Sequence, residues 1–239
     1  TIRPNLDEGD LLVADGSGKV VLIDHSGVQF VVASGGLLGG LRGVTVDRDG
    51  QILVMSQNTG LVRIDPANGA QTLVSSKTNF SSAVFGAWGI AAEPAGTILV
   101  ADGVNGVVRV NPVTGVPTIL AAGNQAPLWM PFGVTLAPNG EIWVTDPGAQ
   151  TDGVNGLLRI NPATGAPTLV SSNGNFTLPA GAAVEASGNV VVANYPDQVL
   201  RINPTNGTQT VVSAGGMLNA SVGLAMKPNG VIYVVNIAG

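Results

Sequence analysis

The sequence predicts an all-β protein built from repeated four-stranded units, and three observations carry this prediction. One motif returns along the 239 residues at intervals of 46, 44, 48 and 42 residues. Gly-containing turn sequences separate short apolar segments, and no segment has apolar residues at the 3.6-residue period of a helix. A fixed period of this length is typical of repeat architectures, so the repeat determines the fold class.

The first half of each repeat predicts two strands joined by a tight turn. It begins with a Gly that is followed by a second Gly seven residues later, as in GVTVDRDGQILVMS from Gly43. The second Gly belongs to a D-G, A-G, N-G or S-G pair, which favours a hairpin because Gly takes the positive φ of such turns. The strand after it is apolar at consecutive positions, ILVM in one copy and IYVV in another. Both faces of that strand must therefore be buried.

The second half of each repeat predicts two more strands. It occupies residues 61–76, 107–122, 157–172 and 199–214, with a looser copy at 19–34. Four copies contain [DN]-P-x-[TN]-G, in which Pro presets φ for a type I turn and the closing Gly takes the left-handed conformation. Each repeat thus has four expected strands, which we name A, B, C and D in chain order.

Units of about 45 residues with four short strands predict a β-propeller. We expect one domain over residues 1–239, with repeat units starting near residues 2, 43, 89, 133, 181 and 223. The last unit has strands A and B only, which favours six blades with a short or incomplete last blade; residues 1–5 are a candidate extra strand for it. The alternative is five blades, with residues 223–227 as strand A of the first. An incomplete blade has an open edge through which the chain could self-associate.

The motif G-x₆-G-x-[IL]-x-V-x-D followed by V-x-R-[IV] resembles the repeats of NHL-repeat propellers. It is also similar to the gluconolactonase/regucalcin-like and virginiamycin B lyase-like groups, and the resemblance covers nearly the whole chain. The resemblance implies a propeller and, for the lactonases, carboxylate and Asn ligands for a metal near the channel mouth. The E-G-P motif that opens those lactonases is missing here, where Glu8-Gly9-Asp10 stands.

Composition excludes several classes of function. The net charge is −5 and only 10% of the residues are charged, so a basic surface for nucleic acid is not expected. No apolar run is long enough for a membrane span. There is no Cys, and the one histidine, His25, lies in a predicted C–D turn where we expect it to be exposed. Thr1 is not a start methionine, which indicates processing or trimming.

Oxygen-bearing side chains recur at the end of strand B. They are Asp15, Ser56, Asp102, Asp146, Asn194 and Asn236. Carboxylate and amide oxygens suit Ca²⁺, so Asp15, Asp102, Asp146, Asn194 and Asn236 are the candidate metal ligands. The competing interpretation is that Asp and Asn cap the following turn by accepting backbone N–H bonds. Because the feature recurs in nearly every repeat, the capping interpretation is favoured.

The loops before strand A differ between repeats and carry most of the aromatic residues. Arg42, Trp88 and Phe132 directly precede or start this strand, and Trp129 and Phe85 lie close by. Aromatic side chains stack on sugars or anchor peptides, although they could equally form an apolar plug. The loop at 147–155 is longer than its equivalents and carries Gln150 and Asp152, and loops that break a repeat are better functional candidates.

Arginines recur in strand C at positions 63, 109, 159 and 201, with Leu22 in the first repeat. We expect a structural role for them, with the aliphatic stem packed on a neighbouring blade and the charged head in water.

The sequence therefore predicts a non-enzymatic binding or scaffold propeller, whose partner is a glycan, peptide or small molecule. The candidate ligand-binding residues are Arg42, Trp88, Trp129, Phe132, Asp146 and Asp152. The first alternative is a Ca²⁺-dependent lactonase-like hydrolase, and the second is a purely structural repeat module. No cofactor is expected unless Ca²⁺ binds. Low charge with abundant Ser, Thr, Asn and Gly favours a secreted or cell-surface bacterial protein.

Overall fold

The computed structural model describes residues 6–81, 86–148 and 155–237, and these contain 21 strands and one short 3₁₀ helix. The chain divides into two compact units: residues 1–100 with 108–118, and residues 101–107 with 119–239. Residues 1–5, the candidate extra strand, lie outside the described residues.

The first unit begins with two antiparallel sheets. The sheet β1-β2-β3 has β1 (Leu11–Asp15), β2 (Lys19–Ile23) and β3 (Gln29–Ser34). The sheet β4-β5-β6-β7 has β4 (Leu41–Val46), β5 (Ile52–Ser56), β6 (Gly60–Ile64) and β7 (Gln71–Ser76), and η1 (Lys77–Asn79) follows it. The next four-stranded sheet contributes residues to both units and has β8 (Ala87–Ala92), β9 (Ile98–Asp102), β10 (Gly106–Val110) and β11 (Pro117–Ala122).

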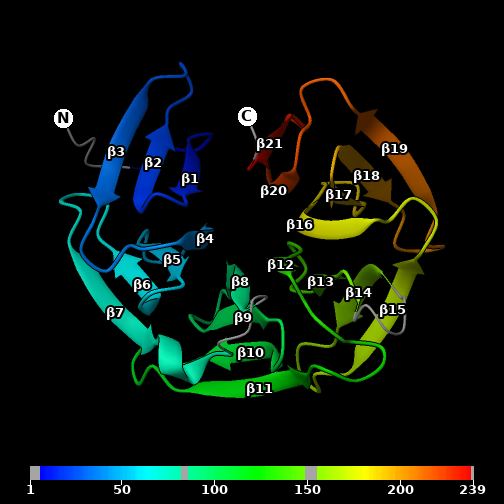
Figure 1. Ribbon diagram of the computed structural model, residues 1–239, viewed down its shortest axis with the longest axis horizontal. Helices are drawn as coiled ribbons and strands as arrows, with labels where there is room; N and C mark the ends of the chain where they lie inside the picture. Colours follow the sequence, from blue (N-terminus) through cyan, green and yellow to red (C-terminus); the bar gives the residue numbers. More distant parts are fainter. Residues whose placement is uncertain (1–5, 82–85, 149–154, 238–239) are drawn as a thin grey trace. The chain divides into compact units, whose positions relative to one another are not determined.

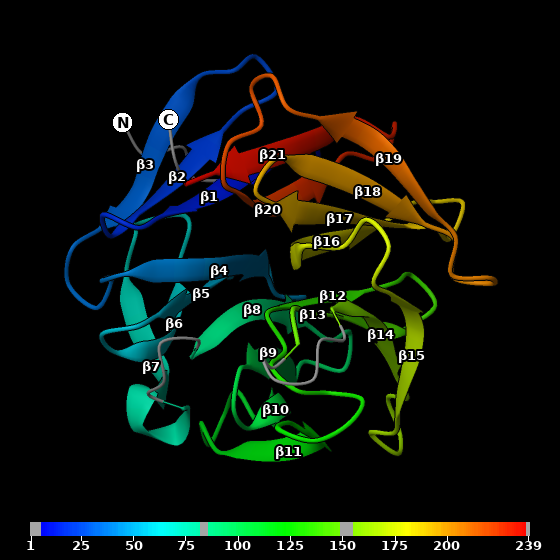
Figure 2. The ribbon, with the colours of Figure 1, turned by 45° about the vertical axis from the view of Figure 1, so that its right-hand side comes forward.

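The second unit contains two four-stranded sheets and a hairpin. One sheet has β12 (Gly133–Leu136), β13 (Ile142–Asp146), β14 (Gly156–Ile160) and β15 (Pro167–Ser172). The other has β16 (Leu178–Val184), β17 (Val190–Tyr195), β18 (Gln198–Ile202) and β19 (Gln209–Ala214). The hairpin consists of β20 (Ser221–Met226) and β21 (Ile232–Asn236). In every sheet neighbouring strands follow each other in the chain, as Figures 1 and 2 show.

Four of the observed sheets confirm the predicted strands A to D, and the sheets correct the number of blades. Counting sheets of three or more strands, the described residues form five blades, so the six-blade prediction is wrong and the five-blade alternative matches the count. The physical reason is that the sixth repeat supplies only strands A and B, which pair with each other as β20–β21. The specific alternative, with residues 223–227 as strand A of the first blade, does not describe this pairing.

The cores lie between consecutive sheets, and strand B contributes to two of them. Ile52 and Val54 pack with β2 and β3 residues, whereas Leu53 and Met55 pack with Ile98 and other residues of the following sheet. All five residues of β5 are buried, and the same holds for β9 and β13. This two-sided burial explains why strand B is apolar at consecutive positions.

Glycines of the C–D turns bring each blade against strand D of the blade before it. Gly69, Gly115, Gly165 and Gly207 have φ between 71° and 73°. An added Cβ at each would lie within 3.0 Å of one carbonyl oxygen, which belongs to Val32, Val74, Leu120 and Val170, respectively. The turns therefore pack backbone against backbone, and any side chain would separate the two blades.

Serine side chains strengthen two of these joints. Ser75 Oγ donates to the carbonyl of Gly115 at 2.7 Å, and Ser171 Oγ donates to the carbonyl of Gly207 at 2.7 Å.

Glycines at the start of strand A pack against backbone of the next blade in the same way as the C–D turn glycines. A Cβ at Gly43 would meet the carbonyl oxygen of Trp88, and a Cβ at Gly133 would meet that of Ala180. These contacts explain the Gly at the start of these two repeats.

Replacing Gly115 by Ala should destabilise the protein more than replacing Gly50 by Ala. Both residues have similar positive φ, 71° and 75°, but no atom lies within 4 Å of a Cβ at Gly50. Gly50→Ala should lose about 1 kcal/mol for the left-handed conformation alone. Gly115→Ala should lose roughly 1–3 kcal/mol more, because its Cβ overlaps the carbonyl oxygen of Val74. Urea unfolding of both variants measures the difference in free energy of unfolding. Equal losses of stability would contradict a tight contact between Gly115 and the carbonyl oxygen of Val74.

Candidate functional site

Asp15 and Asp102, at the end of strand B, cap the turn that follows them. Asp102 is fully buried and accepts bonds from the backbone N–H of Val104 and Asn105, both at 3.1 Å, and from Asn105 Nδ2 at 3.0 Å. Asp15 accepts from the N–H of Ser17 at 2.8 Å and from its hydroxyl at 2.9 Å. The bond from the Ser17 N–H is the main reason that the pKa of Asp15 lies below its ordinary value.

In the second unit, Asn194 ties the loop before strand A to the end of strand B. Its Oδ1 accepts from the N–H of Thr177 at 2.9 Å and of Leu178 at 3.2 Å. Its Nδ2 donates to the carbonyl of Asn175 at 3.0 Å and to Gln198 Oε1 at 3.1 Å. All polar atoms of this fully buried side chain are thus engaged.

Asn236 and Ser56 make the same connection in their own sheets. Asn236 accepts from Ser221 Oγ at 2.9 Å and donates to the carbonyl of Met217 at 2.8 Å. Ser56 Oγ donates to the carbonyl of Gly39 at 2.9 Å and accepts from its N–H at 3.2 Å. The position at the end of strand B therefore binds an adjoining loop in each of these sheets: the following turn with Asp15 and Asp102, and the loop before strand A with Asn194, Asn236 and Ser56.

Asp146 binds both the loop before strand A and the segment after strand B. Its fully buried carboxylate accepts from the N–H of Trp129 at 2.6 Å, of Met130 at 3.0 Å and of Gly148 at 2.7 Å. Burial raises the pKa of Asp146 above its ordinary value, and the three N–H bonds oppose that shift. The carboxylate therefore acts as an internal cap of the loop before β12 rather than as an exposed group.

This arrangement does not fit a Ca²⁺ site. The candidate oxygens of Asp102, Asp146 and Asn194 point to backbone N–H groups of their own blade, whereas a cation needs several of them to converge. Across residues 6–81, 86–148 and 155–237, no three His, Cys, Asp or Glu side chains lie close enough to hold a metal ion. Ca²⁺ binding stays a prediction that the local geometry does not favour.

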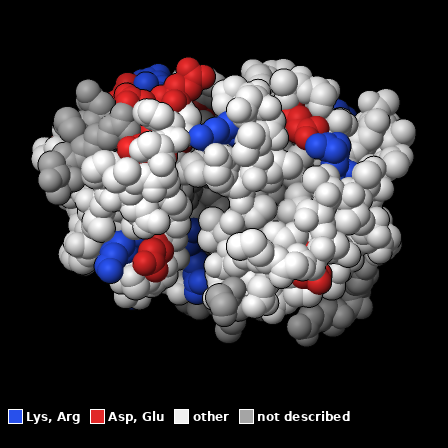
Figure 3. All heavy atoms as spheres, turned by 90° about the horizontal axis from the view of Figure 1, so that it is seen from above, with Lys and Arg blue, Asp and Glu red and all other residues white. Residues whose placement is uncertain are grey.

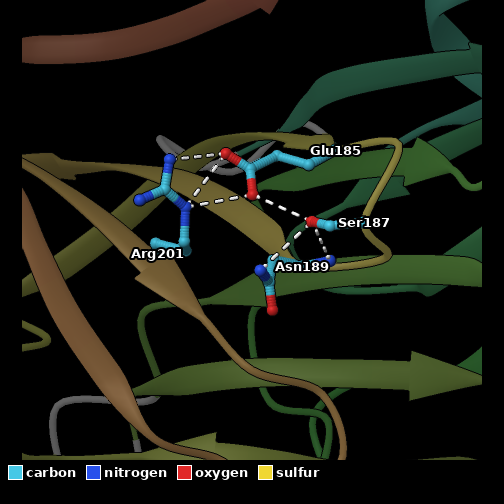
Figure 4. Close-up of polar contacts among 4 residues, drawn as sticks. All are labelled: Glu185, Ser187, Asn189 and Arg201. Carbon is cyan, nitrogen blue, oxygen red and sulfur yellow. Dashed lines mark hydrogen bonds and ion pairs between the residues drawn. The ribbon is translucent and has the colours of Figure 1, made fainter. Parts of the chain in front are cut away.

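The strand C arginines pair with acids of their own sheet. Arg201 binds Glu185 through Nε at 2.9 Å and Nη2 at 2.6 Å, and Ser187 and Asn189 complete the cluster in Figure 4. The other pairs are Arg63–Asp47 at 3.4 Å, Arg109–Glu93 at 2.6 Å and Arg159–Glu141 at 3.1 Å. The predicted structural role holds, but each head group pairs with a carboxylate instead of water alone. The missed signal was the acid at the A–B turn.

Figure 3 shows one face of the molecule on which charged groups are sparse and mostly lie in mixed clusters. This agrees with a chain of only ten basic and fifteen acidic residues. Charges of the A–B turns and of strand C thus neutralise each other locally. Such a surface offers no extended field for a polyanion.

Arg42 differs from the strand C arginines. It lies on β4, and its guanidinium carbon is 4.0 Å from the ring centroid of Trp88 on the adjacent strand β8. Among the described residues it forms no ion pair, and its buried Nε has no hydrogen-bond partner. Burial lowers the pKa of Arg42, although the guanidinium stays charged. Both side chains of this Arg42–Trp88 pair are half-buried and so remain partly accessible.

The other predicted ligand residues have different surroundings. Phe132 is 7% exposed and belongs to the second unit, as do Trp129 and Asp146. Trp129 is half-buried, and its backbone N–H donates to the carboxylate of Asp146. The structure therefore brings Arg42 and Trp88 together in the first unit and Trp129 and Asp146 together in the second. Asp152 lies outside the described residues, as do Phe85 and Gln150.

His25 and a cleft between β15 and β19 are two further candidate features. His25 is exposed in the turn between β2 and β3, as predicted. A shallow cleft of about 460 Å³ lies between β15 and β19. Gln209 lines this cleft, and both polar atoms of its side chain already form hydrogen bonds within the protein. Nε2 donates to Ser171 Oγ, and Oε1 accepts from the N–H of Asn175. This cleft is therefore part of the joint between two blades.

Comparison with solved structures supports the fold. Over 95% of this chain and 85% of the other, the structure is similar to a chain of a nidogen/laminin complex, with a TM-score of 0.77 and 16% identity. It is similar to a gluconolactonase from Xanthomonas campestris (TM-score 0.73, 14% identity, 95% and 79% of the two chains). It is also similar to virginiamycin B lyase from Staphylococcus aureus (TM-score 0.67, 15% identity, 98% and 83%).

These similarities confirm the resemblance to the gluconolactonase-like and NHL-type propellers at the level of fold. The protein has an all-β propeller fold of four-stranded blades. Comparison of the sequence with protein-family models and with curated proteins found no match. Within the described residues, no helix has the length and apolar character needed to cross a membrane.

Replacing Asp146 by Ala should destabilise the fold by about 2–4 kcal/mol, because three backbone N–H groups lose their acceptor. Asp15→Ala, which removes only the bonds from Ser17, should lose less. Thermal unfolding measures both. Wild-type melts in Ca²⁺ and in EDTA should coincide, and a Ca²⁺-dependent shift that disappears in Asp146→Ala would contradict the capping role.

The Arg201–Glu185 pair should stabilise the protein at neutral pH but not in acid. The hydrogen bonds that Arg201 donates to Glu185 lower the pKa of this carboxyl group below its ordinary value of 4.5. A carboxyl group whose pKa is lower in the folded protein than in the unfolded protein stabilises the fold at pH values above its unfolded-state pKa. This stabilisation is lost as the pH falls through the folded-state pKa. Glu185→Gln should therefore cost up to about 1 kcal/mol at pH 7, since Arg201 is partly exposed, and progressively less below pH 4.5. Urea unfolding from pH 7 to 3 tests this, and a pH-independent loss would contradict it.

Proposed function

We propose that this protein is a non-catalytic binding propeller that recognises a carboxylate-bearing ligand, such as an acidic glycan, at the Arg42–Trp88 pair. One observation carries the proposal. Four arginines of the same chain pair with acids, whereas Arg42 stacks on Trp88 and has no acid partner among the described residues. A partly desolvated cation without a counterion favours an anionic ligand.

The chemistry of the pair supports a flat ligand with a charged edge. A guanidinium that stacks on an indole keeps its in-plane N–H donors for a carboxylate, which it can bind in a bidentate manner. Trp88 is half-buried, and its ring offers an apolar face of the kind that stacks on a sugar. Together the two side chains would supply charge recognition and shape recognition at neighbouring positions.

Binding is favoured over catalysis because four carboxylates with little exposure to solvent have other tasks. Asp102 and Asp146 accept backbone N–H bonds, and Glu93 and Glu185 bind arginines. The proposal includes no cofactor. The similar solved structures comprise enzymes and a nidogen/laminin complex alike, so the fold by itself favours neither class.

We further propose a secreted or cell-surface location in a bacterium. The support is the low charge and the abundance of Gly, 34 of 239 residues. A second support is the similarity, with a TM-score of 0.65 and 16% identity, to the extracellular domain of a putative hybrid two-component system from B. thetaiotaomicron; it covers 95% of this chain and 32% of that one.

Replacing Arg42 by Gln should weaken binding of an acidic oligosaccharide at least tenfold. Calorimetric titration with trigalacturonate, compared with neutral galactotriose, measures the preference for charge. The control is Arg48→Gln, since Arg48 is 58% exposed and makes its polar contacts among the described residues with Asp49 and the carbonyl of Ala95. Wild type and Arg48→Gln should both prefer trigalacturonate. Equal binding of the two sugars, or unchanged binding by Arg42→Gln, would refute the proposed site.

A further inference from the structure

Seven Asn-Gly pairs occur along the chain, and the structure distinguishes one of them from the rest. Their asparagines are Asn68, Asn105, Asn139, Asn155, Asn173, Asn206 and Asn229. Asn before Gly is chemically labile, because Gly has no side chain to shield its backbone nitrogen from the neighbouring side-chain amide. The reaction requires an Asn side chain that is free to turn towards that nitrogen. Since Gly follows in all seven pairs, the dipeptide alone predicts similar reactivity for them.

In six of the seven pairs a hydrogen bond holds the Asn side chain. Asn105 Nδ2 donates to Asp102 at 3.0 Å, and Asn155 Nδ2 donates to the carbonyl of Thr177 at 2.8 Å. In the four pairs that lie in A–B or C–D turns, Oδ1 accepts from the N–H two residues later at 2.8–3.2 Å, and the Gly N–H donates across the turn at 2.8 or 2.9 Å. Both reacting groups are therefore fixed in those four turns.

Asn173, in the loop between β15 and β16, is the exception. It is exposed, and its side chain forms no hydrogen bond among the described residues. Its carbonyl accepts from the N–H of Phe176 at 3.0 Å, which makes Gly174 the second residue of a tight turn. Gly174 is also exposed, and its N–H has no hydrogen-bond partner within residues 6–81, 86–148 and 155–237. Both reacting groups of this pair are thus free and accessible to water.

The turn at Asn173 does not depend on an Asn side chain. The same turn follows β3 and β19, where Gly35 and Gly215 take the place of Asn173, and all three residues have a φ of 54–65°. Each donates its N–H to the B–C turn of its own sheet at 2.9–3.2 Å, and the carbonyl of each accepts from the N–H three residues later at 3.0 or 3.1 Å. Asn173→Gly is therefore a matched variant that keeps the backbone of the loop.

We propose that Asn173 is a site of spontaneous modification, at which the folded protein converts this asparagine to aspartate and isoaspartate. The backbone nitrogen of Gly174 loses its proton to water and attacks Cγ of Asn173, which closes a five-membered imide ring. The side-chain amide nitrogen takes up a proton from water and leaves as ammonia. A water molecule then opens the ring at either of its two carbonyls. Water is thus the one co-reactant, and the inference is independent of the ligand proposed for Arg42.

The isoaspartate product would loosen the contact between this loop and β19. Gln209 of β19 binds the loop with both ends of its amide: Nε2 donates to the carbonyl of Asn173 at 3.0 Å, and Oε1 accepts from the N–H of Asn175 at 2.7 Å. In isoaspartate the main chain runs through the side-chain carbons, so the carbonyl that accepts from Gln209 becomes a carboxylate outside the main chain. The two bonds to Gln209 can then no longer form together.

Ageing of the 239-residue protein in mildly alkaline buffer tests the proposal. Peptide mapping by mass spectrometry, with the reaction run in water labelled with heavy oxygen, measures conversion at each Asn-Gly pair. In the folded protein, conversion at position 173 should be at least fivefold faster than at each of the other six. In urea the seven rates should lie close together, because the hydrogen bonds that separate them are lost. After ageing, the melting temperature should fall for the wild type and stay unchanged for Asn173→Gly.

Three outcomes would overturn the proposal. The first is conversion in the folded protein that is no faster at position 173 than at the other pairs. The second is the same preference for position 173 in urea, which would assign the effect to local sequence and not to the fold. The third is an unchanged melting temperature of wild-type protein converted at position 173, which would mean that the loop does not depend on its bonds to Gln209.

Discussion

The structure depends on a backbone-to-backbone contact between consecutive blades. At four C–D turns a glycine with positive φ lies against a carbonyl oxygen of the preceding strand D, where a Cβ would overlap it. This contact fixes the spacing of the outer strands, while Gly43 and Gly133 fix that of the inner strands. Because both ends of a blade are set by glycine, the apolar residues of strand B can fill the space between sheets completely.

Fixed joints leave polar side chains free to shape the loops. Asp, Asn or Ser at the end of strand B holds the loop before strand A, and Arg with an acid holds the A–B turn. Each device lies within one blade, so repeats can be added or altered one at a time. Arg42 departs from this scheme, since it is a cation without the acid that the pattern supplies elsewhere among the described residues. Side chains that depart from the structural pattern are the candidate residues for binding a ligand, because the structural pairs do not use their charge.

The repeat predicted the strands, the turns and the two-sided burial of strand B in β5, β9 and β13 because each depends on local sequence, whereas β21 is half-buried to exposed. It also predicted the capping role of Asp102, which follows from a polar residue placed before a turn, but not that Asn194 binds the loop before strand A. The number of blades could not be obtained in this way, since it depends on whether β20–β21 gains further strands. The stacking of Arg42 on Trp88 was equally inaccessible, because these residues are far apart in sequence and meet only through packing of β4 beside β8.

Native-state hydrogen exchange of the Gly115→Ala variant tests the central claim most directly. If the turn glycine joins two blades, exchange should accelerate in β7, which contains Val74 and Ser75, as well as in β10 and β11. Exchange in β1 and β2, which do not touch this joint, should stay as in the wild type. Acceleration confined to residues 106–122 would contradict the account, because it would mean that the turn matters only to its own blade.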